Sequence, residues 1–242
     1  MLSVYKRELR TYFYSPLAYV LSGIYMFVFS IFFLNDIMSP QGSTQFLFGA
    51  RLYFMSFWLV MLIPILTMRI FAEERKSGTE VLLMTSPVNV GGIVIGKYLA
   101  ALTVFLTMTA LTVIYPIVVS FTGNINVITA VSSYIGYILI GASFVAFGLF
   151  TSSITENQII AAVLGTVGLF FILLIDSIKF LFKEILNGLL FQFIERLSLY
   201  ERFKQFVQGI FNLKDFIFFL SVTGVLIALA MIVIEKRRWS QG

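Results

Sequence analysis

No charged residue interrupts residues 98–155, which read YLAALTVFLTMTALTVIYPIVVSFTGNINVITAVSSYIGYILIGASFVAFGLFTSSIT. A single helix of these 58 residues, rising about 1.5 Å per residue, would be far too long for a bilayer core of about 30 Å. The turn-forming cluster FTGNIN at 121–126 divides the stretch into two apolar segments, 98–120 and 129–151. The sequence therefore predicts two consecutive membrane-spanning helices.

Four further apolar stretches extend this pattern along the chain. They cover residues 17–35, 52–70, 158–176 and 216–234. Charged residues fall near or beyond their ends, because a charge at mid-bilayer costs at least about 2.5–3.5 kcal/mol. We therefore expect an all-α, polytopic membrane protein, in which residues 1–242 form a single transmembrane domain with six transmembrane helices.

The composition agrees with a membrane protein and removes several kinds of chemistry. Hydrophobic residues make up 59% of the 242 residues, charged residues only 12%, and the mean hydropathy is +0.96. A water-soluble domain could not bury that much apolar surface. The chain has no cysteine and no histidine, which excludes disulfides, thiolate or imidazole metal sites and catalysis that depends on histidine.

The basic residues indicate an orientation, with one conflict. Lys6, Arg7 and Arg10 lie near the start of the chain, and residues 236–238 make its end basic. Six spans place both termini on one side, and the positive-inside rule makes that side cytoplasmic. The segment between the last two spans also carries six basic residues, although this topology places it outside. Because the basic residues flank apolar blocks, the net charge of +5 suits anionic lipid headgroups better than nucleic acid.

Two segments outside the spans have the spacing of amphipathic helices. In residues 1–15 an apolar stripe predicts an interfacial helix on the inner leaflet, with a solvated basic lead as the alternative. In residues 179–213 apolar positions also recur at helical spacing, and Ser198-Leu-Tyr-Glu201 has the form of a capping box that starts a short helix ending near Gly209. We expect amphipathic helices here on the outer side, which either pack on the bundle or form a lid over a translocation path.

A third segment, FAEERKSGTEVLLMTSPV at 71–88, follows a charged half with an apolar patch and a proline. It predicts a short cytoplasmic helix whose acidic residues lie at its start, where the helix dipole favours them. The apolar residues 81–84 need a cover, which the membrane surface or a partner protein could provide.

Two stretches of the sequence resemble a known family. One reads KRELRTYFYSPLAY at 6–19, the other reads EERKSGTEVLLMTSPV at 73–88, and Gly96-Lys97-Tyr98 at the third span also fits. They are similar to the ABC-2 type permeases, the membrane subunits of one class of ABC transporters, and most closely to the gliding-motility permease type. The six-helix plan extends the resemblance over the whole chain.

The resemblance implies that residues 73–90 form a coupling helix that docks on a separate ATP-hydrolysing ABC subunit. The residues that would form or shape this contact are Glu73, Glu74, Gly78, Thr79, Leu82, Leu83 and Pro87. The interfacial helix, with Arg7, Glu8 and Arg10, would brace the same subunit. The resemblance also implies a second permease copy or a related permease as partner, a bacterial or archaeal cytoplasmic (inner) membrane, and export or translocation of membrane components.

This chain is accordingly not expected to be an enzyme. We expect no catalytic residue, metal site or cofactor in it, with ATP and Mg²⁺ bound by the partner subunit. Residues 91–97, GGIVIGK, satisfy the phosphate-binding pattern G-x-x-x-x-G-K, but Tyr98 follows where a hydroxyl suited to Mg²⁺ is needed, and a membrane span follows instead of a soluble helix. We expect the glycines to form the turn into the third span.

The main alternative is a secondary transporter or channel subunit driven by an ion gradient. Such proteins usually hold ionisable residues near the bilayer centre. In this chain Arg69, Lys97, Glu156 and Asp176 all fall at the ends of predicted spans, which favours an energy source in another subunit.

Small residues, prolines and threonines inside the spans give packing predictions. The pairs Ala142-x-x-x-Ala146 and Ala161-x-x-x-Gly165 allow close helix approach. Pro64 and Pro116 should kink the second and third spans. The threonines of the third span, at 103, 107, 109 and 112, should bond to their own backbone or to a neighbouring helix.

Overall fold

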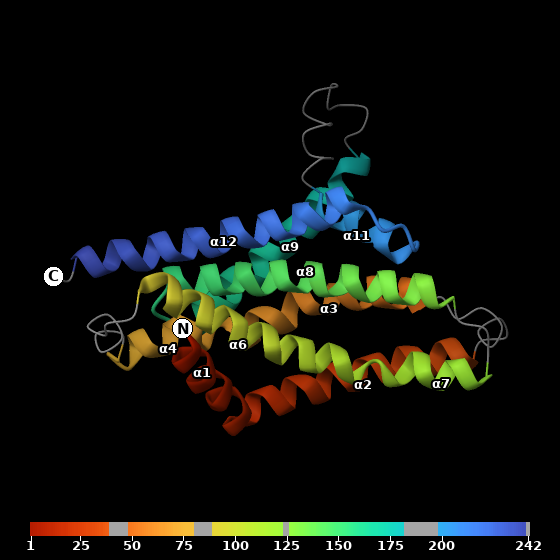
Figure 1. Cartoon of the computed structure of the whole chain (residues 1–242), viewed down its shortest axis with the longest axis horizontal. Helices are drawn as coiled ribbons and strands as arrows, with labels where there is room; N and C mark the ends of the chain where they lie inside the picture. Colours follow the sequence, from red (N-terminus) through yellow and green to blue (C-terminus); the bar gives the residue numbers. More distant parts are fainter. Residues whose placement is uncertain (39–47, 80–88, 123–125, 182–197, 241–242) are drawn as a thin grey trace.

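The computed structural model describes residues 1–38, 48–79, 89–122, 126–181 and 198–240 (Figure 1). Within these ranges the only regular secondary structure is helical, as the sequence predicts. The helices are α1 (Leu2–Tyr14), α2 (Pro16–Met38), α3 (Phe48–Thr67), α4 (Arg69–Lys76), α6 (Val90–Leu111), α7 (Ile114–Thr122), α8 (Val127–Ile154), α9 (Gln158–Leu181), α11 (Leu199–Val207) and α12 (Leu213–Ser240).

Five helical stretches are long and apolar enough to cross a membrane. They are Pro16–Met38, Phe48–Lys76, Val90–Phe121, Val127–Ile154 and Leu213–Trp239. The predicted span 158–176 falls in α9, whose apolar part Gln158–Leu174 is shorter than these five. The chain is therefore a multi-pass membrane protein with five candidate spans in its described part, and the sixth stays a prediction.

Helix α8 forms the middle of the bundle. It packs most extensively against α3 and α12, and it also contacts α6, α9 and α11. Two of its glycines allow this close approach: a Cβ on Gly141 would lie 2.1 Å from the ring of Phe105, and a Cβ on Gly148 would lie 2.1 Å from Thr67 Oγ1. Small residues on the central helix therefore set how near its neighbours lie.

The packing predictions for small residues are confirmed at Ala146, Ala161 and Gly165, whereas Ala142 is only partly buried. Ala146 and Ala161 are buried, and a Cβ on Gly165 would lie 2.9 Å from Pro64 Cβ. Pro64 itself lies inside α3. Close contact at these positions brings α8 and α9 against their neighbours.

The third span contains a break, as its proline predicts. Helix α6 ends at Leu111 and α7 begins at Ile114, and the Pro116 ring hinders a helical bond to the carbonyl of Thr112, four residues earlier. That carbonyl accepts from Tyr115 N at 3.1 Å instead. The Thr112 hydroxyl donates to the Thr109 carbonyl and lies 3.1 Å from the Tyr134 hydroxyl, so the threonine prediction is also confirmed.

The third span begins earlier than predicted. Helix α6 starts at Val90, eight residues before the predicted start at Tyr98. The expectation that residues 91–97 form a turn is therefore wrong, since all of them are helical. Lys97 can lie inside this helix because partners from two other helices neutralise its charge, as described below.

The short helix predicted from the capping box is α11. The Ser198 side chain accepts a hydrogen bond from Glu201 N at 3.1 Å, and Gly209, with φ +83°, follows the end of the helix. Phe203 and Phe206 of this helix are fully buried, and α11 packs on α3 and α8. It therefore packs into the bundle, whereas residues 182–197 of the predicted amphipathic segment lie outside the described residues.

The elements that contain the predicted coupling and bracing residues lie at one end of the bundle. The N-terminus, α4, the start of α6 and the last turns of α12 lie there, while α7 and α11 lie at the opposite end (Figure 1). Helix α1 runs across the direction of α2, with Ser15 between them. Segments far apart in the sequence thus meet around α1 and α4.

Candidate functional site

Lys97 is the centre of a charged site between α1, α4 and α6. Its side chain is 1% exposed, and its ammonium has three acceptors. Lys97 Nζ donates to the Ile70 carbonyl at 2.7 Å and to Glu8 Oε1 at 3.2 Å, and it pairs with Glu74 Oε2 at 2.9 Å. The three N–H bonds of the ammonium are therefore all used.

Arg7 closes the site from the more exposed side. Its Nη2 donates to Glu8 Oε1 at 2.7 Å and to Glu74 Oε1 at 2.8 Å. Arg7, Glu8, Glu74 and Lys97 form what we call the four-charge cluster, whose formal charges sum to zero. The Glu74 side chain is only 16% exposed. Such burial is tolerated because each charge is paired and hydrogen-bonded.

Close contact between α1 and α6 allows Glu8 to reach Lys97. A Cβ on Gly96 would lie 3.2 Å from the Met1 carbonyl oxygen and 3.3 Å from Tyr5 N, so any side chain here would press on the α1 backbone. The Tyr5 hydroxyl lies 3.1 Å from Thr103 Oγ1 on α6. Helix α1 is thus packed directly on α6.

Helix α1 is also held to the end of α3. The buried Tyr12 hydroxyl donates to the Leu66 carbonyl at 3.0 Å. Burial raises the pKa of this phenol, so Tyr12 stays protonated and keeps its donor. The apolar stripe predicted for residues 1–15 therefore packs partly against other helices. The charged Glu8 lies on the same packed side of α1.

Helix α4 is fixed by the end of α8 as well as by the cluster. Ser152 Oγ accepts from Phe71 N at 3.1 Å and from Ala72 N at 3.3 Å, and it donates to the Met68 carbonyl at 3.1 Å. Arg75 Nη1 donates to the Thr155 carbonyl at 2.8 Å. One face of α4 is therefore bound to the membrane bundle over its whole length.

The two adjacent acids predicted for coupling have different positions. The Glu73 side chain is 44% exposed and pairs with Arg69 at 2.7 Å, whereas the Glu74 side chain is 16% exposed and points into the four-charge cluster. The prediction that the acids start the helix is wrong: α4 begins at Arg69 and has no acid in its first turn. The helix starts earlier because it follows α3 almost without interruption.

The end of α4 faces away from the bundle. Gly78 has φ +72° and ends the helix, and its surroundings within 4 Å are open among the described residues. Thr79 is exposed, and its hydroxyl donates to the Glu74 carbonyl at 3.3 Å. Leu82, Leu83 and Pro87, the remaining predicted coupling residues, lie outside the described residues.

The predicted bracing residues of α1 also divide into two groups. Arg7 and Glu8 belong to the four-charge cluster, and Arg10 is exposed. Sequence reasoning missed the central role of Lys97, which it treated as a boundary marker and as part of a phosphate-binding pattern. The signal in the sequence is a lysine between two apolar stretches. Such a lysine is expected to be buried, and a buried lysine needs an acidic partner.

The cluster ties α4 to α1 and α6, and the outer side of α4 ends in exposed polar residues. Helix α4 thus carries part of the polar surface at this end of the bundle, and hydrogen bonds and ion pairs join it to the spans.

One comparison with known proteins identifies the family of the chain. Residues 2–235 match the family model described as ABC-2 family transporter protein. A comparison with curated proteins finds no relative that meets the threshold for a match. Because the family match covers nearly the entire sequence, the chain belongs to the ABC-2 family of transporter proteins.

Proposed function

We propose that this chain is the permease subunit of an ATP-binding-cassette transporter and that α4, with the segment that follows it, couples it to a separate ATPase subunit. The proposal rests on one observation, which is that the two sides of α4 have different contacts. Glu74 holds the helix to Lys97 and Arg7, while Glu73 and Thr79 lie on its accessible side. A partner that binds the accessible side could therefore move the spans joined to the other side.

The mechanism assigns binding and force transmission to this chain and hydrolysis to its partner. ATP and Mg²⁺ belong to the partner subunit in this proposal. Closure of the ATPase would push on Glu73, Gly78 and Thr79. Because the four-charge cluster joins α4 to α1 and α6, these three helices would shift together and change the packing of the spans.

The finer features of the proposal follow the family resemblance. Two permease copies, or this chain and a related permease, would enclose the path for export or for translocation of a membrane component. The chain would lie in the bacterial or archaeal cytoplasmic membrane, with both termini on the cytoplasmic side, where the ATPase is. The similarity of residues 6–19 and 73–88 to the gliding-motility type indicates its nearest subtype.

An ion-gradient mechanism has less support. Its proton or ion relay would need ionisable side chains in mid-span. Among the side chains that the structure describes, no charged one lies at the middle of a candidate span, and the most buried cation, Lys97, already has three acceptors.

Co-purification tests the proposal most simply. The full chain is expressed with the ATPase subunit encoded beside it, and association and ATP hydrolysis are measured. We expect Glu73→Ala with Thr79→Ala to weaken association and stimulated hydrolysis by at least several-fold. Glu235→Ala, which removes an exposed carboxylate at the same end of the bundle, is the matched control and should change neither.

Two results would contradict the proposal. If the Glu73 and Thr79 double variant assembles and hydrolyses ATP like the unmodified complex, α4 is not the coupling element. If the reconstituted chain moves a solute on an ion gradient without any ATPase, the ion-gradient mechanism is correct.

A further inference from the structure

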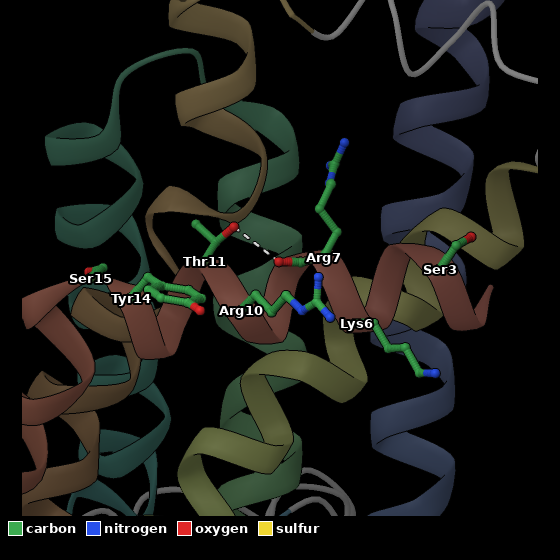
Figure 2. A pocket seen from close by; sticks show the side chains of 7 residues that line it. All are labelled: Ser3, Lys6, Arg7, Arg10, Thr11, Tyr14 and Ser15. Atoms are coloured by element: carbon green, nitrogen blue, oxygen red, sulfur yellow. Dashed lines mark hydrogen bonds between the residues drawn. The ribbon is translucent and has the colours of Figure 1, made fainter.

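The exposed side of α1 contains an open groove of about 660 Å³. Its lining includes the basic side chains of Lys6, Arg7 and Arg10 and the hydroxyls of Ser3, Thr11 and Tyr14, and it includes no acidic residue. Figure 2 shows α1 crossing in front of the other helices, with these side chains along its outer side. The opposite side of α1 packs on α6, so the groove faces away from the bundle.

The three cations of this groove differ in whether an acidic residue pairs with them. Arg7 extends away from the other two and is bound by Glu8 and Glu74 (Figure 2). Lys6 and Arg10 are exposed and form no ion pair with any residue that the structure describes. They are four positions apart, so their Cβ atoms lie about 5–6 Å from each other on one face of the helix. Two like charges at this spacing repel each other, and an anion between them would remove the repulsion.

The residues next to the groove indicate its depth relative to the membrane. Helix α1 ends at Tyr14, and the apolar span α2 begins at Pro16. Tyr14 is 88% exposed. Phe13 and Tyr19 are also exposed, and their rings form an edge-to-face contact with centroids 6.4 Å apart. Exposed aromatic residues beside an apolar span are typical of the headgroup region of a bilayer.

We propose that this groove binds the headgroup of an anionic phospholipid, with its phosphate held between Lys6 and Arg10. The hydroxyls of Ser3 and Thr11 lie beside the cations and can contact the same headgroup. Tyr14 sits at the level where the headgroup meets the acyl chains. Charge complementarity alone would also suit an acidic protein surface, but the exposed aromatic residues at the α1–α2 junction place the groove against lipid.

The site would anchor α1 to the bilayer on the side opposite Glu8 and Lys97, with Arg7 belonging to both the groove and the four-charge cluster. Helix α1 would then be held by lipid at Lys6 and Arg10 and by protein at Glu8 and Tyr12. A lipid site of this kind makes the position of α1 depend on the anionic lipid content of the membrane.

The main readout is lipid binding by the full chain alone, and this readout does not depend on whether the proposed ATPase coupling is correct. The purified chain is titrated in detergent with phosphatidylglycerol and, separately, with phosphatidylcholine, and bound lipids are counted by native mass spectrometry. The unmodified chain should bind phosphatidylglycerol in preference. The variant Lys6→Gln with Arg10→Gln should lose about five-fold in phosphatidylglycerol affinity for each cation removed and keep its phosphatidylcholine affinity.

The control removes the same charge elsewhere. Lys236→Gln with Arg238→Gln takes two exposed cations from the end of α12 and should retain the preference. Circular dichroism establishes that each variant keeps its helix content. Unchanged phosphatidylglycerol binding in the α1 variant, or an equal loss in the control, would overturn the proposal. So would an α1 variant that binds lipid normally but loses a co-expressed ATPase subunit, because the groove would then belong to a protein partner.

Discussion

Lys97 Nζ and Glu74 Oε2 lie 2.9 Å apart, and this ion pair joins the start of a membrane span to the helix proposed to contact the ATPase. Glu8 adds a third helix to the same ammonium. A membrane bundle gains little from apolar contact between its helices because lipid is equally apolar. Paired charges at the bundle end therefore give α1 and α4 a fixed position that apolar packing alone would not specify.

The first prediction concerns the charge of Lys97. In Lys97→Met the carboxylates of Glu8 and Glu74 face Arg7 alone, and the free energy of unfolding should fall by about 3 kcal/mol, because removing one partner from a buried pair leaves an uncompensated charge. Thermal unfolding in detergent, followed by intrinsic tryptophan fluorescence, measures the change. Adding Glu8→Gln and Glu74→Gln to Lys97→Met should restore most of the loss. Equal instability of the single and triple variants would mean that the charges are not the cause.

Glu74 should contribute more to the stability of the chain than Glu73. Glu74→Gln weakens the four-charge cluster and should lower the apparent melting temperature clearly. Glu73→Gln removes only a partly exposed ion pair with Arg69, typically worth about 0.3–0.5 kcal/mol, and should leave the melting temperature almost unchanged. The comparison is made on the purified chain without a partner. The reverse order of the two variants would show that Glu74 does not hold α4 in place.

The close contact at Gly148 predicts a strong effect from one methyl group. The new Cβ in Gly148→Ala would lie 2.1 Å from Thr67 Oγ1 and 3.0 Å from Thr67 Cβ, and overpacking of this kind costs about 1–3 kcal/mol. Gly23→Ala is the control, because nothing lies within 4 Å of its added Cβ among the described residues. Alanine stabilises a helix relative to glycine, so Gly23→Ala should melt at the same temperature or higher. A similar shift in both variants would contradict the close packing of α8 on α3.

Gly96 should control whether α1 stays on α6. A leucine at position 96 collides with the α1 backbone at Met1 and Tyr5, so α1 must move away and Glu8 must leave Lys97. Trypsin reports this movement because α1 contains exposed basic residues. Cleavage within residues 1–15 should become several-fold faster in Gly96→Leu, whereas Gly224→Leu, which has open space at its Cβ, should be cleaved like the unmodified chain. Equal cleavage of all three would show that α1 does not depend on this contact.

The spans were predictable because they depend on a local property. A charge-free run long enough to cross the bilayer is visible in the sequence, and the capping box at Ser198 and Glu201 is a pattern of four residues whose hydrogen bond appears at 3.1 Å. The break before Pro116 follows from the chemistry of one ring. Each of these features is decided within a few residues of the chain.

The cluster was not predictable in the same way. Lys97 is 89 residues from Glu8 and 23 residues from Glu74 in the sequence, and no local pattern indicates that they meet. Treating Lys97 as a boundary moved the predicted start of the third span eight residues too far along. Glu73 and Glu74 are identical and adjacent in the sequence, and only the positions of α1 and α6 make one an accessible residue and the other an internal one.

Site-specific photocrosslinking tests the coupling role of α4 most directly. The chain has no native cysteine, so a single cysteine can carry a benzophenone reagent at Thr79→Cys or, as a control at the opposite end of the bundle, at Glu201→Cys. Each variant is co-expressed with the ATPase subunit in membranes and illuminated. The account predicts that the ATPase is crosslinked from position 79 and not from position 201. Crosslinking from position 201, or from neither position in an assembled complex, would contradict it.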